Sequence, residues 1–320
     1  MGKKKDFLDW WNDRLNVLAR MSPLPEEVFD YIVKKFPHAV NFLYLQGSWT
    51  AIKLAIIAYY QDVYTIIAKK HFGKICYVDA FAGSGIVKIK DHGRLLYGSP
   101  ILAILVPRQN KKFDKLFFIE LDMHRTMVLK EIINYLAMEG KVSKDQVVIM
   151  NKDMNTVNYD KLLKDCDHSL VFLDPEGTEP HWTTVSNLLK LNIDFVMNFM
   201  TAGIRRIWGN YRRNPQKGSG YANRLTEFYG DETWKNASNE HDLLNIYLSK
   251  IKSIRSVIET IEVKGPRMFH YHIIFAFRRT LRGNPWLTAI RRLKERIERT
   301  KYDVFETVLD VFYGRIKPLW

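Results

Sequence analysis

Cysteine is scarce in this sequence, with Cys76 and Cys166 as the only two in 320 residues. Cys76 lies in an apolar, strand-like run, so we expect buried reduced thiols rather than a disulfide. Long apolar runs are also scarce: Leu54–Tyr60 is short and flanked by Lys, so we expect no membrane-spanning helix and no membrane partner. The Lys residues at 3–5 precede no signal-peptide core, and the sequence predicts a cytoplasmic protein.

Acidic residues are the minority charge. The chain has 35 Asp and Glu against 49 Lys and Arg, a formal net charge of +14. Such an excess is informative about partners rather than fold, and it favours nucleic acid or another anionic surface. The 47% of hydrophobic and 26% of charged residues are ordinary for a folded globular chain. His270 and His272 stand without a Cys, His or Asp cluster at metal-ligand spacing, so no metal site is predicted.

The spacing of apolar residues predicts an α/β fold. Residues at three- and four-residue steps predict N-terminal helices over Asp6–Arg20, Pro25–Phe36 and Trp49–Phe72. From residue 74, apolar runs alternate with helical segments, which indicates a parallel sheet covered by helices. The predicted strands are Ile75–Ala80, Leu116–Glu120, Gln146–Met150, Ser169–Asp174 and Phe195–Met200, followed by a hairpin of Val257–Val263 and Phe269–Phe277 around Gly265-Pro266. The segment between Gly85 and Arg94 is predicted as a polar loop.

Acidic residues and glycines follow successive predicted strands, at the edge where open α/β sheets bind ligands. These residues are Asp79, Gly83, Gly85, Glu120, Asp122, Asp153 and Asp174. Taken singly, each has a plainer interpretation: Asp153 as a helix N-cap, Asp174-Pro175 as a turn, and Glu120 as a solvated loop acid. Their recurrence at strand ends predicts a nucleotide-type ligand.

The glycine loop does not match a dinucleotide-binding motif. The third glycine of that motif would fall at Lys88, the next helix begins about a dozen residues later, and no Gly-Lys-Ser/Thr phosphate loop is present. An NAD-dependent oxidoreductase is therefore disfavoured. An uncharged loop beside acids suits a phosphate-free ligand with a cationic centre, and S-adenosylmethionine (SAM) has both properties.

Four motifs resemble those of class I SAM-dependent methyltransferases. They are Val78-Asp-Ala-Phe-Ala-Gly-Ser-Gly85, Gly98-Ser-Pro100, Phe118-Ile-Glu-Leu-Asp122 and Phe172-Leu-Asp-Pro-Glu-Gly177. The ordered set is most similar to the three-Cys-motif partner proteins, which also share an Asn-Phe pair, here Asn198-Phe199. The resemblance covers roughly residues 45–280. It implies a Rossmann-like seven-stranded methyltransferase sheet ending in an antiparallel hairpin, with N-terminal helices and a helical insertion before the hairpin.

The resemblance also implies SAM as cofactor and assigns residues to it. Asp79 and the loop residues Phe81, Ala82, Gly83, Ser84 and Gly85 would lie against the methionine portion. Glu120, with Asp122 beside it, would accept the ribose hydroxyls, and Asp153 and Met154 would hold the adenine.

Asp174, Pro175 and Glu176 are the predicted catalytic residues. They stand where amino-methyltransferases carry Asp/Asn-Pro-Pro-Tyr/Phe, a motif that orients the target amine towards the methyl carbon. That is catalysis mainly by positioning. Here Glu176-Gly177 replaces the last two positions, so the aromatic that stacks on a base is missing. Phe199 or Trp182 is a candidate platform, although each is more often a core aromatic.

The positive charge is concentrated after residue 200. Residues 201–300 contain twenty Lys and Arg against nine Asp and Glu. Arg205-Arg206 and Arg212-Arg213 interleave with aromatic residues there, which predicts a phosphate-contacting surface for RNA or DNA. Lys53, on the third predicted helix, is a further candidate for contact with substrate or cofactor.

Two functional hypotheses follow. The first is a SAM-dependent methyltransferase acting on a nucleic-acid base, and the second is a non-catalytic, methyltransferase-like partner of a radical-SAM-type three-Cys-motif protein. The sequence divides into an N-terminal helical extension (1–45), a SAM-binding core (46–203), a basic helical insertion (204–252), a terminal hairpin (253–285) and a helical tail (286–320).

Overall fold

The computed structural model describes residues 2–90, 92–214, 219–265, 270–278, 285–300 and 302–316. The chain forms two compact units, one of Met1–Asp153 with Arg299–Trp320 and one of Met154–Glu298. This division follows contacts within each unit, and the five functional segments expected from the sequence stay a prediction.

The first unit combines helices with two sets of strands. Its helices are α1 (Gly2–Ala19), α2 (Pro25–Lys35), α3 (Thr50–Ala68), α4 (Ser99–Leu105), α5 (Met123–Met138) and α12 (Tyr302–Phe312), with 3-10 turns η1 (Pro37–Phe42), η2 (Gln109–Lys111) and η3 (Lys144–Gln146). Strands β6 (Val147–Asn151), β5 (Lys115–Glu120) and β2 (Ile75–Asp79) lie in that order and run parallel. All five residues of β2 are buried, as the uninterrupted apolar sequence of a central parallel strand requires.

A small second sheet in this unit corrects one prediction. Strands β1 (Tyr44–Gln46), β3 (Ile86–Ile89) and β4 (Leu95–Tyr97) form a three-stranded sheet, with β1 parallel and β4 antiparallel to β3. The prediction of a polar loop from Gly85 to Arg94 is therefore wrong. These strands are three or four residues long, and β1 pairs with β3, about 40 residues further along the chain. The local sequence pattern therefore does not predict them.

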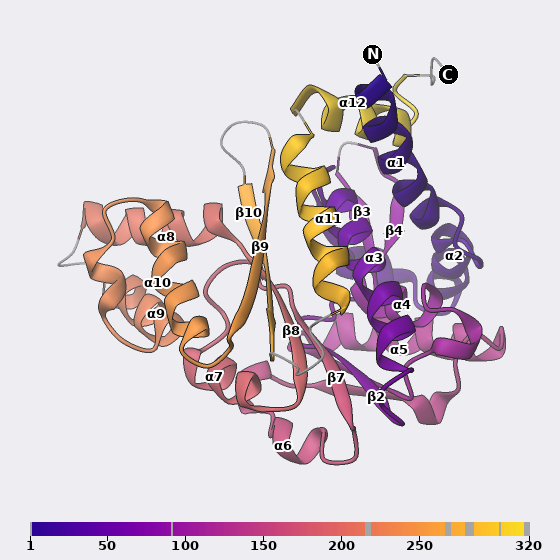
Figure 1. The fold of residues 1–320 in the computed structure, drawn as a ribbon. Coiled ribbons are helices and arrows are strands. Elements are labelled where there is room, and N and C mark those ends of the chain that lie inside the picture. Colours follow the sequence, from indigo (N-terminus) through magenta and orange to yellow (C-terminus); the bar gives the residue numbers. More distant parts are fainter. Residues whose placement is uncertain are drawn as a thin grey trace. The chain divides into compact units, whose positions relative to one another are not determined.

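Helix α12 brings the last part of the described chain back to the first unit. It lies alongside α1 (Figure 1). The Trp11 ring meets Phe305 edge-on at 5.1 Å, and the Trp11 indole N–H donates to Thr300 Oγ1 at 3.3 Å. Trp11 is fully buried, so this packing forms part of the core of the unit.

The second unit holds four strands and a group of helices. Its helices are α6 (Tyr159–Leu162), α7 (Trp182–Lys190), α8 (Thr201–Arg213), α9 (Ser219–Tyr229), α10 (Glu240–Lys252) and α11 (Pro285–Arg299, which crosses the unit boundary), with η4 (Met154–Thr156) and η5 (Thr233–Asn236). The strands are β7 (His168–Leu173), β8 (Ile193–Phe199), β10 (His270–Phe277) and β9 (Val257–Lys264), in that spatial order. β7 and β8 are parallel, and β10 is antiparallel to both of its neighbours.

The predicted fold class is confirmed. The protein is α/β with a seven-stranded mixed sheet whose β8-β10-β9 part is antiparallel, preceded by N-terminal helices. The predicted hairpin is also present as β9 and β10. Its turn lies partly outside the described residues, which resume at His270 after Gly265.

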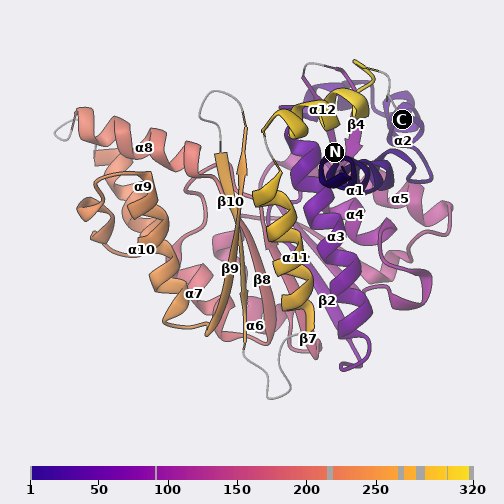
Figure 2. The same cartoon turned by 45° about the horizontal axis from the view of Figure 1, so that its top comes forward.

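Helices α8, α9 and α10 form the insertion that precedes the hairpin and gather at one end of the second unit (Figure 2). An aromatic cluster holds them to the sheet. The Phe228 and Tyr247 rings stack at 4.6 Å, and Phe199 of β8 lies 5.4 Å from Tyr247. All three rings are buried, which makes this cluster the core of the insertion.

Helix α3 is 19 residues long and, by length and composition alone, apolar enough to cross a membrane. Within its apolar window 67% of the residues are buried inside the protein, as in a core helix. The absence of a membrane partner stays a prediction.

The prediction of reduced thiols is contradicted, because both Cys76 and Cys166 are disulfide-bonded. An apolar neighbourhood predicts that Cys76 is buried, but it does not predict whether the thiol is oxidised. The cytoplasmic location stays a prediction.

Candidate functional site

The loop after β2 is shaped by two glycines. Gly83 has φ of +61° and Gly85 of +80°, the left-handed region that favours glycine. A Cβ added to Gly85 would lie 2.8 Å from Leu129 Cδ1, and one on Gly83 would lie 3.2 Å from the Tyr44 ring. The Ser84 hydroxyl donates to the Ile86 carbonyl at 2.8 Å. The predicted loop is therefore a fixed turn that closely packed neighbours hold in one shape.

Glu120, at the end of β5, joins this loop to the neighbouring strand. One carboxylate oxygen accepts the N–H of Gly83 at 2.8 Å, and the other accepts the N–H of Asp122 at 2.9 Å. The side chain of Asn151 donates to the Glu120 carbonyl at 3.0 Å, so β6 fixes the same turn. Glu120 is only 6% exposed, and its orientation is set by backbone groups.

Asp79, at the end of β2, lies beneath the loop. It is fully buried, and its carboxylate accepts the Tyr77 hydroxyl at 3.1 Å and the N–H of Phe81 at 3.3 Å. A buried carboxylate must be hydrogen-bonded to offset its loss of hydration. Asp79 therefore orders the residues that the sequence places against the methionine portion of a cofactor. Tyr77 was not predicted; its position two residues before the acid, on the same face of the strand, was the available signal.

The remaining predicted cofactor residues differ in their surroundings. Asp122 caps α5: its carboxylate accepts the N–H of Arg125 at 2.9 Å, and this bond lowers the Asp122 pKa from its ordinary value. Asp153 is half-buried after β6 in the first unit, whereas Met154 is buried in the second. Lys53 is half-exposed on α3. The donors and acceptors of the first unit fit a ligand with hydroxyl and cationic groups and no phosphate.

In the second unit, Asp174 follows β7 and is half-buried. It accepts a hydrogen bond from the Asn198 side chain of β8, whose Nδ2 lies 2.7 Å from Asp174 Oδ1. Pro175 is buried and Glu176 is exposed. The structure thus brings the first predicted catalytic residue together with an asparagine that the sequence analysis named only as part of a family pattern.

The backbone after Pro175 is held by two contacts. The N–H of Gly177 donates to Glu179 Oε2 at 2.7 Å. A Cβ added to Gly203, in the first turn of α8, would lie 2.7 Å from the Glu176 carbonyl oxygen. Gly203 therefore lets the helix approach the Glu176 backbone. It was missed in the sequence, although a glycine inside a predicted helix is a recognisable signal of close approach.

A second polar group lies where α8 meets β10. Thr201 Oγ1 and His272 Nδ1 are 2.7 Å apart, and His272 Nε2 is 4.0 Å from Glu262 Oε1. Burial lowers the His272 pKa to about 4, so the imidazole is neutral near pH 7. His270 Nε2 lies 3.4 Å from Glu240 Oε1. Both histidines lie on strand β10, as the sequence predicted.

The four predicted phosphate-binding arginines are not equivalent. Arg205 pairs with Glu240 at 3.0 Å, and the Arg212 guanidinium lies 4.7 Å from the Trp208 ring. Arg206 and Arg213 are exposed and form no ion pair within the described part of the chain. These two therefore have the most readily available charges of the four.

Neither candidate base platform is an open aromatic surface. Phe199 is fully buried in the aromatic cluster. Trp182 is half-buried, meets Tyr247 edge-on at 5.5 Å and has Lys250 Nζ 5.6 Å from its ring. The plainer interpretation, that of core aromatics, describes Phe199 fully and Trp182 in part.

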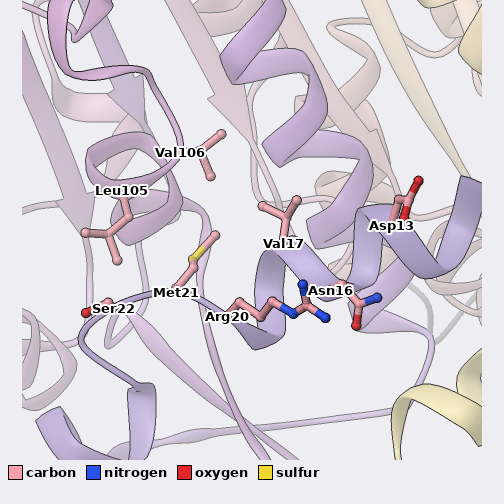
Figure 3. Close-up of a pocket in the computed structure, with 8 residues that line it drawn as sticks. All are labelled: Asp13, Asn16, Val17, Arg20, Met21, Ser22, Leu105 and Val106. Atoms are coloured by element: carbon pink, nitrogen blue, oxygen red, sulfur yellow. The ribbon is translucent and has the colours of Figure 1, made fainter.

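The described residues contain no group of three or more His, Cys, Asp or Glu arranged to hold a metal ion. Figure 3 shows one cavity of the first unit, about 510 Å³, which none of the predicted site residues lines. It is lined by Asp13, Asn16, Val17, Arg20, Met21, Ser22, Leu105 and Val106.

No protein-family model and no curated protein matches this sequence. Among solved structures, protein LPL1258 from Legionella pneumophila strain Philadelphia 1, of family model DUF519, is 12% identical. The match covers 81% of this chain and 92% of that one, with a TM-score of 0.44. The N-terminal domain of human METTL16 in complex with SAH is 11% identical over 71% of this chain and 70% of that one, with a TM-score of 0.36.

A putative methyltransferase, yhhF from Escherichia coli, is 13% identical over 69% of this chain and 86% of that one, with a TM-score of 0.31. With TM-scores of 0.31 to 0.44, these structures assign neither a family nor a chemistry to this chain.

Proposed function

We propose that this protein is a SAM-dependent methyltransferase acting on nucleic acid, RNA or DNA, with a base nitrogen as target. The observation that carries the proposal is the pairing of Glu120 with the Gly83 loop. Each carboxylate oxygen of Glu120 accepts one backbone N–H. Because a carboxylate oxygen has two lone pairs, acceptor capacity is left for the ribose hydroxyls of a cofactor. The loop itself carries no charge, which suits a ligand without phosphate.

In this proposal the protein's own side chains orient the target amine towards the methyl group. When bound, SAM would supply an electrophilic methyl group on its sulfonium, and an amine that took this methyl group would give up one proton. Asp174 is the acceptor for the N–H of the target, which orients the nitrogen lone pair. The backbone after Pro175, fixed by Gly177 and Gly203, is the second candidate acceptor.

The basic insertion supports a polyanionic substrate. Arg206 and Arg213 on α8 are exposed and form no ion pair in the described chain, and guanidinium groups bind phosphate in a bidentate manner. We assign the principal phosphate contacts to these two residues. Arg205 contributes less to phosphate binding, because Glu240 already pairs with its guanidinium group.

The second candidate is a non-catalytic nucleic-acid-binding partner of a radical-SAM-type three-Cys-motif protein. The motif resemblance to three-Cys-motif partner proteins supports it. One structural observation favours it as well: Glu176-Gly177 replaces the base-stacking aromatic, and Phe199 is buried away from any substrate.

The experiment measures binding of labelled SAM and then methyl incorporation into tRNA, rRNA and DNA. We expect SAM binding and transfer to one of these polymers. Asp174→Ala should keep SAM binding and lose transfer, whereas Asp160→Ala, an exposed acid on α6, is the control that keeps both. SAM binding without transfer to any polymer of a cell extract would favour the non-catalytic candidate. Absence of SAM binding would overturn both the cofactor and the enzyme assignment.

A further inference from the structure

Asn198 is a polar side chain in a buried strand. It lies on β8, all seven residues of which are buried, and it is 1% exposed. Its Nδ2 donates to Asp174 Oδ1 at 2.7 Å and to the Met200 sulfur at 3.1 Å. Both amide hydrogens are therefore engaged, one of them by the carboxylate that the proposed function places against the substrate.

The other end of the Asn198 amide has no partner. Its Oδ1 is buried and accepts no hydrogen bond from the described residues. A buried carbonyl left in this way costs about 1–3 kcal/mol. Turning the amide over would satisfy Oδ1 no better, because the oxygen would then face the Asp174 carboxylate. The charge on Asp174 thus fixes the amide with its N–H groups towards the acid.

An apolar side chain at position 198 would avoid this cost but would take from Asp174 the donor that Asn198 supplies. We propose that Asn198 is a positioning residue for Asp174: its amide fixes the direction of the carboxylate so that the acid accepts an N–H of a substrate amine. This inference rests on the proposed function and narrows it to a target that carries a hydrogen on nitrogen. A carboxylate held by an N–H donor is an acceptor, which matches an amine rather than a thioether or a ring nitrogen without hydrogen.

Tyr271 is a titratable group on which the charge of Asp174 acts. Tyr271 of β10 is fully buried, and burial together with the negative charge of Asp174 raises its pKa well above its ordinary value. Tyr271 therefore stays a neutral phenol in the pH range in which carboxyl groups titrate. His272, the next residue along, is engaged with Thr201.

The test compares Asn198→Leu, Asn198→Asp and wild type in methyl transfer from labelled SAM to the polymer that wild type methylates. Asn192→Leu is the matched control: Asn192 immediately precedes β8, at the opposite end of the strand, and donates to the Asp167 carbonyl. Thermal unfolding and the dissociation constant for SAM are measured for each protein.

For Asn198→Leu we expect kcat to fall about tenfold or more, as when a supporting hydrogen bond to a reacting group is removed. KM for the polymer and the SAM dissociation constant should stay within about twofold, so that the loss is confined to the reaction step. For Asn198→Asp the introduced carboxyl lies beside Asp174, and the charge of the first carboxylate makes the second carboxyl keep its proton to higher pH. At low pH the protonated carboxyl donates as the amide does, so activity relative to wild type should fall as pH rises.

Unchanged kcat in both variants, with wild type active, would overturn the positioning role and leave the methyltransferase assignment standing. A fall in kcat matched by Asn192→Leu would do the same, because the loss would then be structural. An inactive wild type overturns the proposed function, and the inference falls with it.

Discussion

The two units present their acids in different ways. In the first unit Glu120 is held by the backbone N–H groups of Gly83 and Asp122, so local chain geometry sets its position. In the second unit Asp174 is held by the side chain of Asn198, 24 residues further along the chain. A backbone N–H is lost only when proline is substituted, whereas a side-chain partner is lost in many substitutions. The position of Asp174 is therefore the more sensitive of the two to a single substitution at its partner.

The largest expected effect is on SAM affinity, and it distinguishes Glu120, a predicted cofactor ligand, from Asp122, which caps α5. Glu120→Ala should weaken SAM binding about a hundredfold or more, nearly 3 kcal/mol, and should lower stability because the N–H of Gly83 loses its acceptor. Asp122→Ala removes the cap of α5 and should cost about 1 kcal/mol of stability. Calorimetric SAM titration and thermal unfolding measure both. If both variants lost SAM affinity equally, Asp122 would also contact the cofactor. If Glu120→Ala kept its SAM affinity, Glu120 would not be a cofactor ligand.

The second effect concerns a buried histidine of the second unit, His168. Burial, with the nearby charges of Arg255 and Arg278, lowers its pKa from 6.5 to about 4. The folded state therefore binds fewer protons than the unfolded one, and the free energy of unfolding falls as pH drops from 6.5 to about 4. The loss from this residue approaches 3 kcal/mol. Urea unfolding between pH 4 and 8 should show a shallower fall in His168→Gln. The same slope in variant and wild type would mean that folding leaves the His168 pKa unchanged.

The third effect tests how closely α8 approaches the predicted catalytic segment. Gly203→Ala would place a Cβ 2.7 Å from the Glu176 carbonyl, so helix or loop must shift. We expect a loss of about 1–3 kcal/mol in stability and a fall in methyl transfer. Gly209→Ala, in the same helix with no atom within 4 Å of the added Cβ, should be stabilising by about 0.5–1 kcal/mol. If thermal unfolding gave the two variants the same stability, the close contact at Gly203 would not exist.

The smallest effect concerns individual surface charges. Replacing Arg206 and Arg213 by Ala should reduce the slope of log binding constant against log salt by about 0.7–0.9 per arginine. Arg205→Ala should change it less, because Glu240 already pairs with that side chain. Fluorescence anisotropy with a labelled RNA at several salt concentrations measures the slopes. An unchanged slope in the double variant would place the phosphate contacts on another surface.

The same difference between the units explains what could be read from the sequence. The buried parallel strands were predicted to within two residues, because β2, β7 and β8 each contain a short apolar run, and an acid ends β2 and follows β7. The Gly83 loop was predicted because left-handed turns favour glycine and backbone contacts follow from local order. Strands β3 and β4 were missed because their stability comes from pairing with each other and with β1.

Contacts between side chains that are distant in the sequence could not be predicted from the sequence. The bond from Asn198 to Asp174 depends on the parallel pairing of β7 and β8, which brings the ends of the two strands together. The pairing of Arg205 with Glu240 depends on how α8 and α10 pack. A run of arginines indicates a basic surface, but only the folded chain separates the neutralised members from the available ones.

The return of α12 to the first unit has a consequence for the order of folding. The Trp11 and Trp49 rings lie 5.1 and 5.5 Å from Phe305, and Trp11 is also bonded to Thr300. A ribosome must therefore translate residues 154–298 before the first unit can bury these indoles. The second unit, by contrast, is continuous in sequence from Met154 to Glu298. A chain interrupted before residue 300 would leave two tryptophans uncovered, which is the kind of surface that chaperones and proteases recognise.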